Sequence, residues 1–159
     1  PVLPALCRAW NPAANAPINM TLSCTRRIEF DAAHRVMEHE SKCKHLHGHR
    51  YALEATFRAE GLDTLGRVVD FSVIKERLGG WILENWDHAT ILYDKDKALG
   101  KAISDITGQK IFYLAANPTA ENMAEYILRD ICPKLFEKLD ITCTHVRLYE
   151  TPNCFADVT

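Results

Sequence analysis

A cysteine and three histidines stand within seven positions of the chain. Cys43, His45, His47 and His49 all fall in the segment 42–51. Thiolates and imidazole nitrogens are the ligands that zinc prefers in proteins. A metal centre is therefore the first chemistry to consider, and a histidine-rich loop that binds nothing is the alternative.

The spacing of two of these histidines suits a shared ion. The stretch 51–58 alternates apolar and polar residues, which is typical of a half-buried strand. If that strand begins near Leu46, His47 and His49 point to the same face, about 6.6 Å apart. Both can then reach one zinc ion, because a zinc–nitrogen bond is about 2.0–2.1 Å long.

A third ligand must come from another part of the chain, and we expect it to be His34. This residue ends a second strand-like run, 27–34. His45 shares the face of His47 and His49, but three ligands on one strand are nearly collinear, which tetrahedral zinc disfavours. Three neutral imidazoles with an open fourth position describe a catalytic zinc better than a structural one.

Composition limits the remaining function classes. The 159 residues form one domain, and 47% hydrophobic with 25% charged residues is typical of a soluble globular protein. A net charge of −2 gives no general attraction to nucleic acids or anionic membranes. No apolar run approaches the roughly 20 residues that span a bilayer, and no secretory leader is visible. We expect neither a nucleic-acid nor a membrane partner.

The six cysteines predict a reducing, cytoplasmic location. None of them forms a C-x-x-C pair, and a chain of this size needs no disulfides to fold. Cys43 differs from the others because Lys42, Lys44 and the histidines surround it. Nearby cations and a metal stabilise a thiolate, so Cys43 is our candidate base or nucleophile.

The strands and helices that must position these residues can be predicted from the hydrophobic pattern of the sequence and from its helix-capping residues. Residues 1–19 are rich in proline and have no period, so we expect a disordered tail or an extension there and a single domain over 20–159. The predicted elements are strands over 22–33, 46–60, 141–149 and 154–158, and helices from Asp70 or Ser72 to 85 and from Thr119 to about 139.

Two regions are weakly patterned. Residues 93–110 are charged and are interpreted as a loop with one helical turn at most, and 111–114 is a short apolar run. Pro133 is expected to kink or divide the second helix. The resulting order, ββααββ, favours an α+β fold in which two main helices cover one face of an antiparallel four-stranded sheet.

Two motifs resemble a known family. Phe30-Asp31-Ala32-Ala33-His34, followed by Cys43-x3-His47-Gly48-His49, resembles the 6-pyruvoyltetrahydropterin synthase family. The gap between Cys43 and His47 is similar to the bacterial branch, the 6-carboxy-5,6,7,8-tetrahydropterin synthases of queuosine biosynthesis. The resemblance runs from about Thr25 to the end. It implies the tunnelling fold (T-fold), in which four or six subunits join their sheets into a β-barrel with active sites at the interfaces.

The resemblance also implies an activity. It is that of a zinc-dependent lyase converting 7,8-dihydroneopterin triphosphate to 6-carboxy-5,6,7,8-tetrahydropterin, acetaldehyde and triphosphate. The alternatives are formation of 6-pyruvoyltetrahydropterin on the same scaffold, or a non-catalytic pterin- or metal-binding homologue.

The family's site residues can be placed on this sequence. Zinc would be held by His34, His47 and His49; Cys43 would remove a proton, assisted by Asp87 and His88; and Glu150, with Thr119 and Glu121 near it, would bind the pterin. Each assignment has a simpler alternative: Asp87-His88 as a surface pair or cap, Glu150 as a solvent-facing strand end, and Thr119 and Glu121 as the start of a helix.

Overall fold

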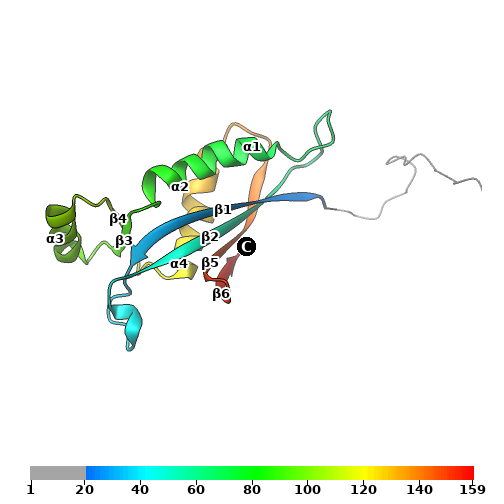
Figure 1. The fold of residues 1–159 in the computed structure, drawn as a ribbon. Coiled ribbons are helices and arrows are strands. Elements are labelled where there is room, and N and C mark those ends of the chain that lie inside the picture. Colours follow the sequence, from blue (N-terminus) through cyan, green and yellow to red (C-terminus); the bar gives the residue numbers. More distant parts are fainter. Residues whose placement is uncertain (1–20) are drawn as a thin grey trace, which may run out of the picture.

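A six-stranded mixed sheet forms the centre of the molecule. The computed structural model describes residues 21–159, so the prediction for residues 1–19 lies outside the described residues. The sheet order is β4-β3-β1-β2-β5-β6, with β3 parallel to both β1 and β4 and all other pairs antiparallel (Figure 1). The strands are β1 (Ser23–His34), β2 (His47–Arg58), β3 (Thr90–Tyr93), β4 (Ile111–Leu114), β5 (Thr142–Thr151) and β6 (Cys154–Val158).

Two long helical runs and one separate helix accompany the sheet. The runs are interrupted by π-helical turns, and a short 3-10 turn, η1 (Lys42–Lys44), lies between β1 and β2. The first run comprises α1 (Phe71–Ile74), η2 (Lys75–Gly79) and α2 (Gly80–Asn85); α3 (Lys97–Thr107) stands alone; the second run comprises α4 (Ala120–Tyr126), η3 (Ile127–Ile131) and α5 (Cys132–Phe136). No helix among residues 21–159 is both long and apolar enough to cross a bilayer.

One face of the sheet packs against the two helical runs and forms the core. Alternate residues of β1 and β2 point to this face, and over 30–34 and 51–57 they are buried there, as the period of two requires. Phe30 and Tyr51 stack with ring centroids 5.2 Å apart, and Trp86 lies 5.8 Å from Phe30. All three side chains are essentially inaccessible to solvent. The same face carries His34, His47 and His49 at one end of the strands, so the core fixes the backbone from which these rings project.

The structure shows the predicted starts of the two long helical runs and the predicted break in the second. The Asp70 side chain accepts from the Ser72 amide, which resolves the choice of cap in favour of Asp70. Thr119 caps α4 by accepting from the Asn122 amide at 3.3 Å. Pro133 lies at the start of α5, directly after a π-helical turn, so it divides the second run as expected.

The predicted four-stranded antiparallel sheet and the order ββααββ are wrong. The strands β3 and β4 extend the sheet beside the end of β1, where Ala33 pairs with Thr90 and His34 with Ile91. Each is four residues long, and such a short apolar run cannot be told from a helix exit by its pattern. The fold class, α+β, is retained.

The interpretation of 93–110 as a loop is also wrong. Helix α3 fills most of this segment and lies beside β3 and β4, away from β5 and β6 (Figure 1). It begins after Asp96 and ends at Gly108, whose φ of 71° is the left-handed conformation that glycine adopts easily. The charged residues of the helix itself, Lys97, Lys101 and Asp105, are exposed, whereas Asp96 directly before it is buried.

Candidate active site

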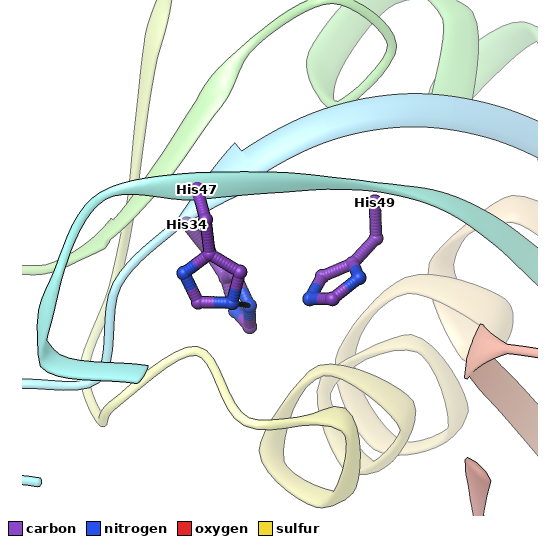
Figure 2. Close-up of side chains that lie close together, drawn as sticks. All are labelled: His34, His47 and His49. Atoms are coloured by element: carbon purple, nitrogen blue, oxygen red, sulfur yellow. Dashed lines mark hydrogen bonds between the residues drawn. The ribbon is translucent and has the colours of Figure 1, made fainter. Parts of the chain in front are cut away.

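Three histidine rings from two neighbouring strands converge on one point. His34 pairs with His47 across β1 and β2, and His49 follows two residues later on the same face. The ring centroids are 4.6 Å apart for His34 and His47, 5.1 Å for His34 and His49, and 4.9 Å for His47 and His49. Figure 2 shows the three rings directed into a common space beneath β2. The grouping predicted from the sequence is therefore present, and these donors, all within 4.8 Å of one another, could hold a metal ion.

The hydrogen bonds of two rings leave their facing nitrogens without protons. The Nδ1–H of His34 donates to the Pro118 carbonyl at 2.7 Å, and that of His47 donates to the His45 carbonyl at 2.7 Å. When both rings are neutral, these bonds direct two Nε2 lone pairs at each other across 3.1 Å. Two such acceptors repel unless a cation lies between them. Two ligands of a tetrahedral zinc are about 3.3 Å apart, so this donor set fits a metal.

Burial opposes the alternative, in which a proton bridges the rings. Desolvation lowers the pKa of His34 to about 4, although its hydrogen bond to Pro118 acts in the opposite direction. Burial and the nearby His47 likewise lower the pKa of His49. His34 and His49 are therefore neutral around neutral pH, and the neutral imidazole is the form that binds metals.

A pocket of about 200 Å³ adjoins the histidines. Its wall includes His34, Cys43, Thr119, Glu121 and Glu150. The site residues taken from the sequence on this side of the molecule therefore surround one cavity, although they come from β1, η1, α4 and β5. The pocket is open and mixed in polarity, as a site for a polar small molecule requires.

Glu150 is the carboxylate closest to the histidine cluster. Its Oε1 lies 3.8 Å from Nε2 of His34, and its side chain is half-buried at the end of β5. Burial raises the pKa of Glu150, and the charge of Glu121 raises it further. The solvent-facing alternative for Glu150 does not describe this position, whereas Glu121 is exposed and Thr119 serves as a helix cap as well as lining the pocket.

Cys43 reaches the pocket from the loop between β1 and β2. It lies in the turn η1, and its carbonyl accepts from the Val36 amide at 2.8 Å, which closes the loop on itself. The thiol is half-buried and lines the same pocket as His34. The arrangement places the Cys43 thiol on the pocket beside the histidine cluster, without making it a member of that cluster among the described residues.

Asp87 and His88 form a pair on a different surface. The His88 Nδ1–H donates to Asp87 at 2.9 Å, and the second oxygen of Asp87 accepts from the Asp31 amide at 3.0 Å. Partial burial raises the pKa of Asp87, but these hydrogen bonds outweigh it and the pKa is lowered overall. His88 lines a separate, more open cavity of about 480 Å³ together with His49, and the His88 side chain is 78% exposed. Within one chain, the structure does not bring His88 to the Cys43 pocket.

Two backbone carbonyls complete the histidine cluster and were missed from the sequence. They belong to Pro118 and His45, which fix the orientation of His34 and His47. A backbone acceptor has no residue type that would mark it in a sequence, and only the folded chain reveals it.

Comparison with known proteins identifies the family. The family model described as 6-pyruvoyl tetrahydropterin synthase matches residues 23–159. The chain belongs to this family. A 6-carboxy-5,6,7,8-tetrahydropterin synthase of Rickettsia bellii is 53% identical over 137 residues, which cover 86% of this chain and 99% of that relative. The family resemblance seen in the histidine and cysteine motifs is thereby confirmed.

Solved structures confirm the fold. An uncharacterized protein of Wolinella succinogenes superposes with a TM-score of 0.74 at 21% identity, covering 87% of this chain and 98% of that one. The 6-pyruvoyl tetrahydropterin synthase of Caenorhabditis elegans gives a TM-score of 0.59 at 21% identity, with 88% and 96% coverage. The predicted tunnelling fold is therefore present at the level of the single chain.

Proposed function

We propose that this chain is a zinc-dependent 6-carboxy-5,6,7,8-tetrahydropterin synthase of the queuosine pathway. It would convert 7,8-dihydroneopterin triphosphate to the carboxypterin, acetaldehyde and triphosphate. The observation that carries the proposal is a cluster of three imidazoles, one of which lines the same pocket as Cys43 and Glu150, in a chain 53% identical to a synthase of that name.

His34, His47 and His49 are the proposed zinc ligands. Bound there, zinc would supply a Lewis acid that polarises an oxygen of the substrate side chain. The Pro118 and His45 carbonyls hold two of these imidazoles in the tautomer whose Nε2 is free. The chain thus provides the ligand geometry before any ion binds.

Cys43 and Glu150 act on different parts of the substrate. Glu150 would accept two N–H bonds from the pterin ring, a pairing for which a carboxylate has the correct geometry. Cys43, as the thiolate, would remove a proton from the substrate side chain. Thr119 and Glu121 line the same pocket and are proposed as additional pterin contacts.

Asp87 and His88 are proposed to serve the pocket of a neighbouring subunit. Asp87 fixes the proton of His88 on Nδ1, so that Nε2 can exchange protons with a substrate. The exposed position of His88, bordering a cavity separate from that of Cys43, suits a group that completes a site across an interface. A tetramer or hexamer whose sheets join into a barrel would provide such interfaces, and would also cover the free edges of β4 and β6.

A product assay tests the proposal. Purified zinc-loaded protein is incubated with 7,8-dihydroneopterin triphosphate, and the pterin product is identified by mass. A 6-carboxypterin is expected. A 6-pyruvoyl product would reassign the chain to the other activity of the family, and binding without turnover would make it a pterin-binding homologue.

Chains carrying Cys43→Ala and chains carrying His88→Ala, assembled together, should regain activity that neither has alone.

A further inference from the structure

The side chain of Asn117 forms two hydrogen bonds with the backbone of a single residue. Its Oδ1 accepts from the Met37 amide at 2.8 Å, and its Nδ2 donates to the Met37 carbonyl at 3.1 Å. We refer to these two bonds as the Asn117 clasp. A carboxamide offers one donor and one acceptor side by side, so a carboxylate of the same shape can form only one of the two bonds.

The clasp fixes one wall of the pocket. Met37 lies in the 35–46 loop, which connects β1 to β2 and carries Cys43. The bond from the Val36 amide to the Cys43 carbonyl links the turn η1 to the residue directly before Met37. The clasp therefore ties the base of this loop to the segment before α4, 80 residues further along the chain.

The backbone of Asn117 fixes the opposite wall. Its carbonyl accepts from the Thr119 amide at 2.8 Å and from Nδ2 of Asn122 at 2.8 Å. Pro118 lies between these anchored residues, and its ring also restricts its own φ angle. The Pro118 carbonyl is the acceptor that orients His34. Asn117 is thus held on both sides, and the acceptor for a proposed zinc ligand is the next group along the chain.

We infer that Asn117 is a positioning residue for the metal centre. It holds the Pro118 carbonyl where it orients His34, and at the same time it holds the loop that carries Cys43 against the same pocket. The inference rests on the proposed function as a zinc enzyme. Removing a group that orients a metal ligand weakens metal binding roughly 10–100-fold, so zinc affinity is the quantity that Asn117 should control.

The variant Asn117→Asp tests this inference with the least change of shape. It retains the acceptor for the Met37 amide and loses the donor to the Met37 carbonyl. The matched control is Asn85→Asp, which loses a bond of the same kind, from Nδ2 to the Trp81 carbonyl at 2.9 Å, at the end of α2. Zinc dissociation constants are measured by competition with a chromophoric chelator. The visible spectrum of the cobalt-substituted protein reports the ligand geometry.

Zinc binding should weaken only in the variant that breaks the Asn117 clasp. Asn117→Asp is expected to bind zinc at least roughly 10-fold more weakly than the wild type and to alter the cobalt spectrum. Asn85→Asp should keep wild-type zinc affinity and spectrum, even if both variants lower the melting temperature of the metal-free protein. A general loss of stability would affect both variants alike, whereas a positioning role affects one.

A measurement on the unmodified protein covers the case in which Asn117→Asp does not fold. Coupling is reciprocal, so if the clasp favours zinc binding, zinc must stabilise the clasp by the same factor. Hydrogen exchange at the Met37 amide should therefore slow roughly 10-fold or more when zinc is added.

The outcomes separate this inference from the proposed function. Wild-type zinc affinity and an unchanged cobalt spectrum in Asn117→Asp would overturn the inference and leave the proposed function intact. Exchange at Met37 that is indifferent to zinc would overturn it in the same way. A wild-type chain that binds no zinc would overturn the proposed function and this inference together.

Discussion

The Nε2 atoms of His34 and His47 lie 3.1 Å apart, and hydrogen bonds to carbonyls hold both protons on the opposite side of each ring. Two unprotonated nitrogens at this separation could hold a cation between them. The register of β1 against β2 creates this arrangement, because His34 and His47 are direct partners across the ladder. A one-residue slip would turn His47 and His49 to the other face of the sheet.

Replacing Cys43 with alanine should separate proton transfer from metal binding. Loss of a general base typically slows a reaction about 10²–10⁴-fold. We expect turnover of dihydroneopterin triphosphate to fall by such a factor while zinc content is unchanged. Cys24→Ala, a half-buried thiol on β1, is the control and should keep wild-type turnover. Unchanged product formation in Cys43→Ala would remove the cysteine from the mechanism.

Replacing Glu150 with glutamine should weaken the pterin complex and stabilise the free protein. Burial raises the pKa of Glu150, which means that its charged form is destabilised by folding at neutral pH. Glutamine removes that charge and also removes one of the two acceptors for the pterin N–H groups. Calorimetry should show a higher melting temperature together with a raised dissociation constant for a pterin. Tight pterin binding by Glu150→Gln would contradict the assigned role.

The stability of the metal-free protein should fall in mild acid because of His34. Its pKa is about 4 in the folded state, against 6.5 as the ordinary value, so the unfolded chain binds the proton more readily between these values. This contribution is present above pH 6.5 and disappears as the pH falls towards 4. Denaturant unfolding should show a loss of about 2 kcal/mol between about pH 7 and about pH 5. In His34→Gln this loss should shrink by the same amount. If the free energy of unfolding fell with pH as steeply in His34→Gln as in the wild type, His34 would be excluded as the source of the loss.

The ion pair between Arg35 and Asp96 should stabilise the edge of the sheet nearest His34. Arg35 donates to both oxygens of Asp96, at 2.5 and 3.2 Å, and the Asp96 side chain is only 8% exposed. Arg35→Ala leaves this carboxylate buried without its partner, and we expect a cost of about 2 kcal/mol in the free energy of unfolding. The control is Lys101→Ala, which breaks an exposed pair with Asp105 and should cost about 0.5 kcal/mol or less. Equal costs would contradict the account.

The sequence was most informative where residues of a metal-binding type fall at the two-residue spacing of a strand face. The alternation along β2 predicts that His47 and His49 share a face, and the end of the preceding strand supplies His34. The caps at Asp70 and Thr119 are local interactions that depend on residue type, so they too can be read directly.

The parts that the sequence did not reveal depend on tertiary contacts. The strands β3 and β4 exist because they pair with the end of β1, and their four residues carry no signal of their own. Simple alternation along 141–149 would put Cys143 on the same sheet face as His145. A bulge near Thr144 turns it towards the helices instead, where it meets Cys132 of α5. The separation of His88 from the Cys43 pocket is likewise a property of the fold alone.

X-ray absorption spectroscopy of the purified protein, combined with metal analysis, tests the central claim most directly. The account predicts about one zinc per chain with three nitrogen ligands at about 2.0–2.1 Å, and loss of the zinc in His34→Ala. A protein purified without chelators that contains no zinc would contradict it. So would a sulfur ligand at about 2.3 Å, because Cys43 would then bind the metal and could not serve as the base.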